Sequence, residues 1–207
     1  MSRTRSGFTL IELLVVVCII SILLGLSLVG LTHVLNTSHA NATEAMLKDL
    51  AAACVSYQQK WGDYPPGALE EIGGRAPNEI NTGVETLVAC LSSKKRGGPF
   101  FQRDDHLSNV DADSADRNLT DWYFKTNELF EYTDYFGNAI LYFHHKDYEK
   151  TRSSLTRYKL SADGEEVRVL PEFHPTTKAP VEAGRFQIRS VGRDGKPGTG
   201  DDLRAGN

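Results

Sequence analysis

Several features that would point to an enzyme or a nucleic-acid-binding protein are missing from this chain of 207 residues. The formal net charge is −4, and Lys94-Lys95-Arg96 is too short a basic cluster to favour nucleic acid as a partner. Three cysteines do not make a disulfide framework, although Cys54 and Cys90 could pair in an oxidising compartment. There is no locally supported serine–histidine–aspartate set, nucleophile elbow or zinc motif, so nothing marks an enzyme active site.

Charged side chains are also absent from residues 13–42, and residues 13–31 are almost entirely apolar. A helix of about 20 apolar residues can cross a bilayer of roughly 30 Å, which predicts a membrane helix. Arg3 and Arg5 precede it and indicate that the amino end stays in the cytoplasm. Glu12 is the exception, because a carboxylate at the edge of a lipid-facing helix costs a few kcal/mol unless a partner neutralises it.

Two explanations of Glu12 are open from the residues alone. Cleavage between Gly7 and Phe8 would create an α-amino group on Phe8, and a neighbouring subunit could present this cation to Glu12. Alternatively, Glu12 snorkels or is protonated at the membrane edge.

The segment Gly7-Phe8-Thr9-Leu10-Ile11-Glu12-Leu13-Leu14-Val15 resembles the class III signal of type IV pilins and type II secretion pseudopilins. The resemblance implies that a prepilin peptidase cuts after Gly7, that Phe8 is then N-methylated, and that Glu12 guides filament assembly. It also implies that the apolar run is kept as the inner part of a helical filament. Ordinary secretion is the rival, since Ala40-Asn41-Ala42 fits a signal-peptidase site, but the apolar run exceeds the usual length of about 7–15 residues.

The predicted helix continues beyond the apolar run to Gln59, roughly 78 Å at 1.5 Å per residue. Its second half is amphipathic and carries one apolar stripe, formed by Leu47, Leu50, Cys54, Tyr57 and Trp61. Gly62, followed by Pro65 and Pro66, predicts where the helix ends.

The remaining sequence predicts one short helix and a small antiparallel sheet. Apolar spacing favours a helix at 82–91, and β-branched and aromatic residues favour strands at 139–143 and 185–190. A hairpin is expected for 155–160 and 167–170 around the turn at 161–164.

Two polar stretches predict ordinary surface. Residues 100–121 are acidic and polar, and Asp111-Ala112-Asp113-Ser114-Ala115-Asp116 lacks the glycine turn and terminal glutamate of an EF-hand, so we expect a solvated loop there. His144 and His145 are adjacent in an expected strand and should point to opposite faces, which excludes joint chelation of one ion.

The carboxyl end, from Ser190 to Leu203, is rich in glycine and carries Asp194, Asp201 and Asp202. Such loops supply the carboxylate and carbonyl oxygens that Ca²⁺ prefers, although an unliganded tail is equally open on chemistry alone. The stretch is similar to the calcium loop of the major pseudopilin of type II secretion. The resemblance implies side-chain ligands from Asp194, Asp201 and Asp202 and a backbone carbonyl ligand from Val191. The turn at 134–138 also resembles the Asp-x-x-Gly-Asn turn of that family.

The resemblance as a whole implies an α+β, type IV pilin-like fold with a structural Ca²⁺ and no enzymatic activity. Residues 1–7 would be the cleaved leader, 8–31 the transmembrane and filament-core half of the helix, and 32–207 a periplasmic globular domain. The chain would be a single-pass inner-membrane protein that polymerises with itself into a periplasmic pseudopilus. Its other partners would be minor pseudopilins, the prepilin peptidase and the inner-membrane assembly platform. Two alternatives are a type IV pilin for adhesion or DNA uptake, and a membrane-anchored periplasmic binding module or hydrolase.

Overall fold

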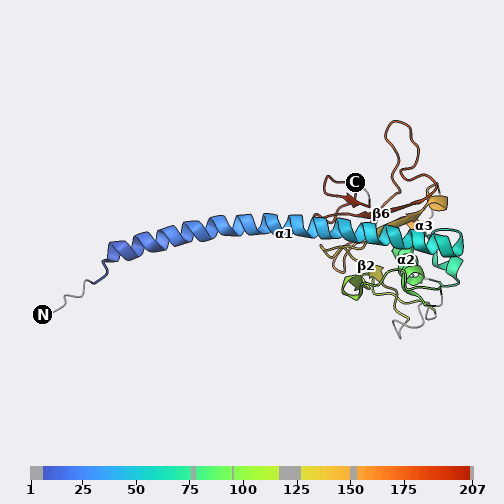
Figure 1. Ribbon diagram of the computed structural model, residues 1–207, viewed down its shortest axis with the longest axis horizontal. Helices are drawn as coiled ribbons and strands as arrows, with labels where there is room; N and C mark the ends of the chain where they lie inside the picture. Colours follow the sequence, from blue (N-terminus) through green and yellow to red (C-terminus); the bar gives the residue numbers. More distant parts are fainter. Residues whose placement is uncertain (1–6, 76–77, 95, 117–126, 150–152, 206–207) are drawn as a thin grey trace. The chain divides into compact units, whose positions relative to one another are not determined.

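The computed structural model describes residues 7–75, 78–94, 96–116, 127–149 and 153–205, without the side chains of 26–31 and 153–154. The chain divides into two compact units, Met1–His39 and Ala40–Asn207. Helix α1 (Leu10–Trp61) contributes to both units (Figure 1).

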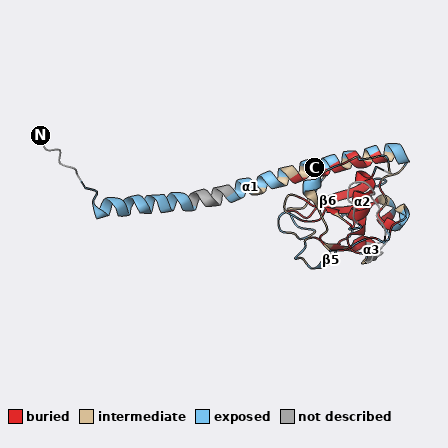
Figure 2. Cartoon of the chain, turned by 90° about the horizontal axis from the view of Figure 1, so that it is seen from below, coloured by how far each residue is buried: buried red, intermediate tan, exposed pale blue. Residues whose placement is uncertain are grey.

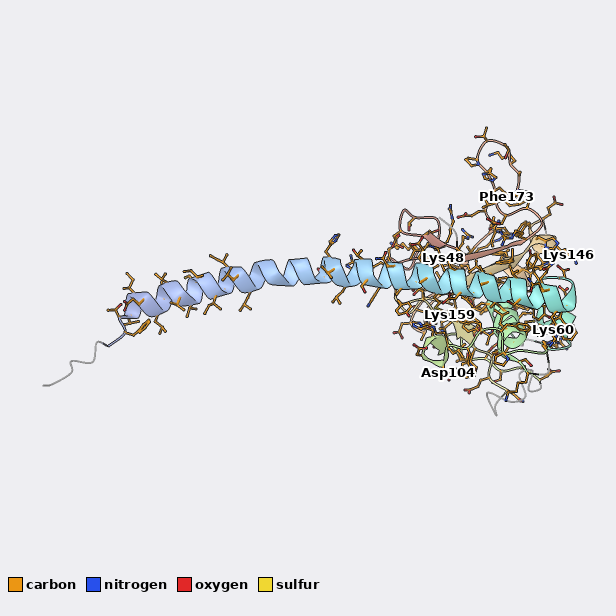
Figure 3. The ribbon with its side chains drawn as sticks, viewed as in Figure 1. Lys48, Lys60, Asp104, Lys146, Lys159 and Phe173 are labelled. Carbon is orange, nitrogen blue, oxygen red and sulfur yellow. The ribbon has the colours of Figure 1, made fainter. Side chains whose placement is uncertain are left out.

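The first unit exposes apolar side chains all around its helix. Every described residue from Gly7 to Gly25 is exposed, with 85% of Leu10 and 60% of Leu24 accessible (Figure 2). The side chains that are drawn stand out on all sides of the helix (Figure 3). Over the described residues, no helix contains a stretch that is both long enough and apolar enough to span a membrane.

The second unit is built on the amphipathic half of α1. The predicted stripe is confirmed at Leu47, Leu50, Cys54 and Tyr57, which are buried together with Met46 in the main core. Trp61 continues the stripe beside Tyr57, with ring centroids 6.3 Å apart, but it is 51% exposed at the helix end, where its Nε1 donates to the carbonyl of Arg96 at 2.8 Å.

Helix α1 ends just before a glycine, as the sequence predicts. Gly62 has a φ of +83° and donates its N–H to the carbonyl of Gln58, so the predicted glycine stop is confirmed.

Cys54 and Cys90 are both buried in the main core, and both are free thiols.

Helix α2 (Thr82–Ser92) confirms the second predicted helix and is buried along its whole length. It packs against two strands of the second unit, β2 (Glu131–Tyr132) and β3 (Leu141–His144). The short helical segments are η1 (Leu69–Ile72), η2 (Asp104–His106), η3 (His145–Asp147) and α3 (Ser153–Thr156).

Over the residues that the structure describes, the strands form three small antiparallel sheets where the sequence predicts one. The central sheet has the order β3-β6-β7, with β6 at Phe186–Ser190 and β7 at Leu203–Arg204. In the β3–β6 register, Leu141 lies opposite Arg189. The other two sheets are β2 with β1 (Leu107–Ser108), and the predicted hairpin, β4 (Arg157–Lys159) with β5 (Glu166–Arg168).

The strand predicted at 139–143 begins two residues later because its first backbone groups bond elsewhere. The N–H of Ala139 donates to the carbonyl of Leu160 at 2.7 Å, and that of Ile140 donates to the carbonyl of Tyr132 at 2.8 Å. These two hydrogen bonds link the start of β3 to the neighbouring sheets. All three sheets contribute side chains to one core.

Replacing Leu50 by alanine should destabilise the second unit by about 2–5 kcal/mol, because it removes a fully buried side chain from the core. Chemical unfolding of the purified chain, followed by near-UV circular dichroism, measures the change. Leu170→Ala is the matched control, since Leu170 is half exposed and should cost less than about 1 kcal/mol. Equal losses for the two variants would contradict the assignment of this core.

Candidate functional site

The amino-terminal segment places Glu12 in a reciprocal hydrogen-bonded cap. Glu12 Oε2 accepts from the backbone N–H of Thr9 at 2.8 Å and from its hydroxyl at 2.7 Å. The Thr9 hydroxyl oxygen in turn accepts from the N–H of Glu12 at 3.3 Å. This is a capping box, in which a threonine and a glutamate three residues later satisfy the free N–H groups of a helix start. The Thr9-x-x-Glu12 spacing is the sequence signal for this cap, which was not among the features predicted from the sequence.

Gly7 and Phe8 lie just before this cap, in exposed and non-helical backbone. A protease needs an extended and accessible peptide, because a helical one has its backbone groups already paired. The Gly7–Phe8 bond is therefore accessible and lies outside α1.

The carboxyl-terminal loop is clamped to the turn at 134–138. Asp134 Oδ2 accepts from the hydroxyl of Ser190 at 2.5 Å, and Asn138 Nδ2 donates to the carbonyl of Gly192 at 2.8 Å. Gly192 is required here: its φ is +66°, and a Cβ would lie 2.2 Å from the carbonyl oxygen of Asp201. Two stretches far apart in sequence thus hold the loop where it leaves β6.

The aspartates of this loop accept hydrogen bonds from its own backbone. Asp201 Oδ2 accepts from the N–H of Asp194, and Asp202 Oδ2 from that of Gly198, both at 2.9 Å. The Thr199 hydroxyl donates to Asp201, and these bonds lower the pKa of Asp201 below its usual range. Asp194, Asp201 and Asp202 keep further lone pairs, but they are not among the described side chains whose ligand atoms all lie within 4.8 Å of one another.

The acidic stretch around Asp111 differs from the prediction of a solvated loop. Asp113 is buried, and Asp111 is partly buried. Both lie beside Glu85 in the first turn of α2 and Glu131 in β2, which are also buried. The prediction failed because these four acids come from three separate stretches, so no local pattern reveals that they meet.

Burial and mutual repulsion dominate the electrostatics of this acidic cluster, which we define as Glu85, Asp111, Asp113 and Glu131. Loss of solvent raises the pKa of Asp113 to about 7, with the neighbouring Asp111 adding to the shift. Burial is also the main cause of the raised pKa values of Glu85, Asp111 and Glu131. The Glu85 pKa is raised further by the negative charges of the other three.

The histidine pair also differs from its prediction. His144 ends β3 and His145 begins η3, so the chain turns between them and the ring centroids lie only 4.3 Å apart. His144 is buried and faces Asp63, with Nε2 at 3.3 Å from Oδ1. Burial, with His145 as second cause, lowers the pKa of His144. Lys146 forms an ion pair with Asp63. The negative charge beside the two histidines is therefore already balanced by a lysine.

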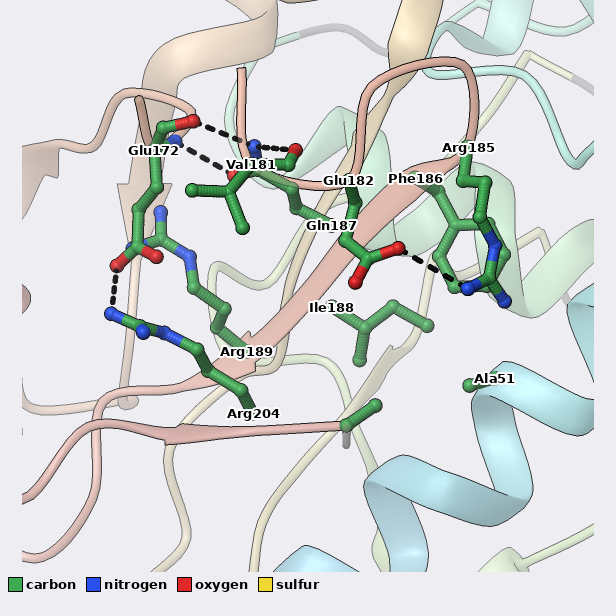
Figure 4. Close-up of a pocket in the computed structure, with 11 residues that line it drawn as sticks. Ala51, Glu172, Val181, Glu182, Arg185, Phe186, Gln187, Ile188, Arg189 and Arg204 are labelled. Carbon is green, nitrogen blue, oxygen red and sulfur yellow. Dashed lines mark hydrogen bonds and ion pairs between the residues drawn. The ribbon is translucent and has the colours of Figure 1, made fainter. Parts of the chain in front are cut away.

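A pocket of about 140 Å³ lies beside β6 (Figure 4). Gln187 holds its rim, since its side chain bonds the N–H and carbonyl of Glu172 and the carbonyl of Val181 at 2.7–2.9 Å. Glu172 pairs with the buried Arg189 at 2.5 Å and with Arg204 at 2.9 Å. The pocket is smaller than the roughly 300–1,000 Å³ typical of ligand sites, and its charges are already paired.

Comparison with known proteins identifies a family motif at the amino-terminal end of the chain. Residues 2–28 match the family model described as the prokaryotic N-terminal methylation motif. This range contains Gly7, Phe8 and the Thr9–Glu12 cap. Neither a curated protein nor a solved structure matches the chain.

Replacing Asn138 by alanine should loosen the carboxyl-terminal loop, because it removes the hydrogen bond to the Gly192 carbonyl. The loss of one such bond, about 1 kcal/mol, corresponds to roughly fivefold faster amide hydrogen exchange in residues 192–203. Asn127→Ala at an exposed asparagine is the matched control and should leave exchange in this loop unchanged. Unchanged exchange in Asn138→Ala would mean that other contacts hold the loop.

Proposed function

Because residues 2–28 carry the N-terminal methylation motif, the signature of type IV pilin-like proteins and pseudopilins, we propose that this chain is a structural subunit of a type II secretion pseudopilus. A prepilin peptidase cleaves it after Gly7, and the new amino terminus at Phe8 is methylated. The subunit then polymerises in the periplasm with further copies of itself and with minor pseudopilins on an inner-membrane assembly platform. The filament drives protein export across the outer membrane, and the subunit performs no catalysis.

The exposed apolar helix is the main structural support for this proposal. Soluble proteins rarely expose large contiguous apolar surfaces, and those that do use them to contact lipid or another protein. Residues 8–24 expose every described apolar side chain. A single-pass inner-membrane anchor covers this surface with lipid before assembly, and neighbouring subunits cover it in the filament.

Glu12 supports the assembly step through its position. Thr9 supplies hydrogen bonds to one oxygen, Oε2, of the Glu12 carboxylate. An ionised carboxylate has about four lone-pair sites, so Oε1 is available to a cation from a neighbouring subunit. The methylated amino group of Phe8 on that neighbour is the cation that we assign to this role.

The carboxyl-terminal loop is proposed to bind a structural Ca²⁺. Asp194, Asp201 and Asp202 would provide carboxylate oxygens, and Val191 a backbone carbonyl. The ion would join both ends of the loop, which otherwise depends on hydrogen bonds within itself and on the Asn138 clamp. A terminal segment with few packing partners gains order from such a link.

Replacing Glu12 by alanine in cells should leave cleavage intact and abolish filament assembly, because the acceptor for the neighbour's amino group is lost. Mass spectrometry of the mature chain checks processing through the loss of residues 1–7, and electron microscopy checks assembly. Cleavage after Ala42 would instead support ordinary secretion.

The variants Thr9→Val and Glu12→Gln test whether filament assembly needs the negative charge of Glu12 or only its hydrogen bonds to Thr9. Thr9→Val removes the hydroxyl bond to Glu12 but keeps the carboxylate, so it should still assemble. Glu12→Gln keeps a capping oxygen without the charge and should fail. If Glu12→Gln assembles normally, or if Thr9→Val fails as completely as Glu12→Ala, the counter-charge mechanism is wrong.

Calcium should slow amide exchange in residues 191–203, and a chelator should reverse the effect. At a hundredfold excess of calcium over its dissociation constant, bound ion stabilises a site by about 2.7 kcal/mol, or roughly a hundredfold in exchange rate. Asp202→Ala should abolish this local response. Asp163→Ala, at an exposed aspartate in the β4–β5 turn, is the control and should retain it. If calcium does not change the amide exchange rates of residues 191–203 in the unsubstituted chain, the loop has no calcium site.

A further inference from the structure

We propose that the acidic cluster of Glu85, Asp111, Asp113 and Glu131 is a second cation site, which binds one Ca²⁺ inside the folded domain. This site is separate from the carboxyl-terminal loop, and it does not depend on the proposed role in secretion.

The carboxylates converge in space. Glu85, Asp111 and Asp113 each offer one oxygen that lies within 4.8 Å of the oxygens offered by the other two. This spacing lets a single ion contact all three, because Ca²⁺–oxygen distances are about 2.3–2.6 Å. Glu131 adjoins the group and adds to its negative charge.

The buried oxygens without partners point most directly to a ligand. Glu85 is 1% exposed, and neither of its carboxylate oxygens accepts a hydrogen bond from the described residues. The same holds for both oxygens of Asp113, which is 7% exposed. Buried polar groups are almost always hydrogen-bonded, so a fully buried carboxylate with two free oxygens implies a group that completes it.

Nearby positive charge does not offset the burial of the cluster: burial raises the pKa of Asp111 even though the charge of Lys159 acts in the opposite direction. In the part of the chain that the structure describes, none of its members forms an ion pair with a lysine or arginine. Four acids facing one another repel strongly in an environment of low polarity. A divalent cation offsets both the desolvation and the repulsion.

The surrounding residues hold the acids in place without neutralising them. The side chain of Asn109 makes two hydrogen bonds to the backbone of Asp113. Asn109 Oδ1 accepts from the Asp113 N–H at 3.0 Å, and Asn109 Nδ2 donates to the Asp113 carbonyl at 2.8 Å. Between them Ala112 adopts a φ of +59°, a conformation that non-glycine residues rarely take. This tight turn sets the positions of Asp111 and Asp113 relative to Glu85.

Three further amide groups, two from side chains and one from the backbone, hold Glu131 and Asp111 in place. Asn81, which caps α2, donates to Glu131 Oε1 at 3.0 Å, while the N–H of Val110 donates to Oε2 at 2.9 Å. Asn78 donates to Asp111 Oδ2 at 2.8 Å.

The donor chemistry selects the ion. The converging ligands are carboxylate oxygens, and neither histidine nor cysteine joins the group. Such donors favour hard cations, and the irregular set of acids from three stretches suits the flexible coordination of Ca²⁺ better than the strict octahedron of Mg²⁺. The competing explanation is that protons, rather than a metal ion, neutralise the cluster.

Calcium titration of the full chain in detergent, after removal of metal by chelator, tests the site. The variant Asp202→Ala disables the carboxyl-terminal loop and should still bind one equivalent of calcium in isothermal calorimetry. Adding Glu85→Gln to this variant should weaken the remaining binding by roughly tenfold or more, because one charged ligand is lost. No calcium binding by Asp202→Ala would overturn the proposal and leave the loop site standing. One equivalent that is lost in Glu85→Gln but unaffected by Asp202→Ala would support the cluster and remove the loop site.

Thermal unfolding then separates a metal ion from protons. In chelator, Glu85→Gln should raise the melting temperature, because it removes one repelling buried charge. In calcium it should lower the melting temperature relative to the unsubstituted chain, because a ligand is missing. An effect of the same sign and size in both buffers would mean that protons satisfy the cluster. Asp113→Asn should show the same reversal, while Asp116→Asn, an exposed neighbour outside the group, should respond equally in both buffers.

Discussion

Burial of one face of α1 is the interaction on which the rest of the globular unit depends. Met46, Leu50 and Tyr57 lie in the main core together with side chains from α2 and from strands of all three sheets. Because that core sets the position of α2, it also sets the position of Glu85 in the first turn of the helix. The two proposed cation sites are therefore consequences of packing, since their acids are carried by elements that the core aligns.

Negative charge is accommodated in three different ways. At the start of α1, Glu12 completes a capping box with Thr9, where the free N–H groups of a helix favour an anion. In the carboxyl-terminal loop, backbone N–H groups donate to the aspartates, which are largely in contact with solvent. In the acidic cluster Glu131 accepts the N–H of Val110, but Glu85 has neither solution, because it is buried and its oxygens receive no hydrogen bond from the described residues. The cluster is thus the place where a bound cation changes the energetics most.

The apolar half of α1 gives the chain a surface that it does not cover itself. The second unit buries its own apolar side chains, whereas the described residues of the first unit up to Gly25 are exposed. A methylation motif at 2–28 on such a helix fits a subunit whose final environment is a membrane or a filament. The proposed role assigns the globular unit to the outside of that filament, where the proposed Ca²⁺ would stabilise it.

The local parts of this structure follow from the sequence. The amino-terminal motif, the α1 stripe, the glycine stop at Gly62, α2 and the β4–β5 hairpin depend on patterns within a few turns or residues, so they could be predicted. The Thr9–Glu12 cap was equally predictable from its spacing. Only the tertiary structure brought Glu85 beside Asp113, turned His145 onto the same side as His144, and divided one expected sheet into three. Those outcomes depend on contacts between residues far apart in the chain, and periodicity and propensity carry no information about which distant segments the packing of a core will bring together.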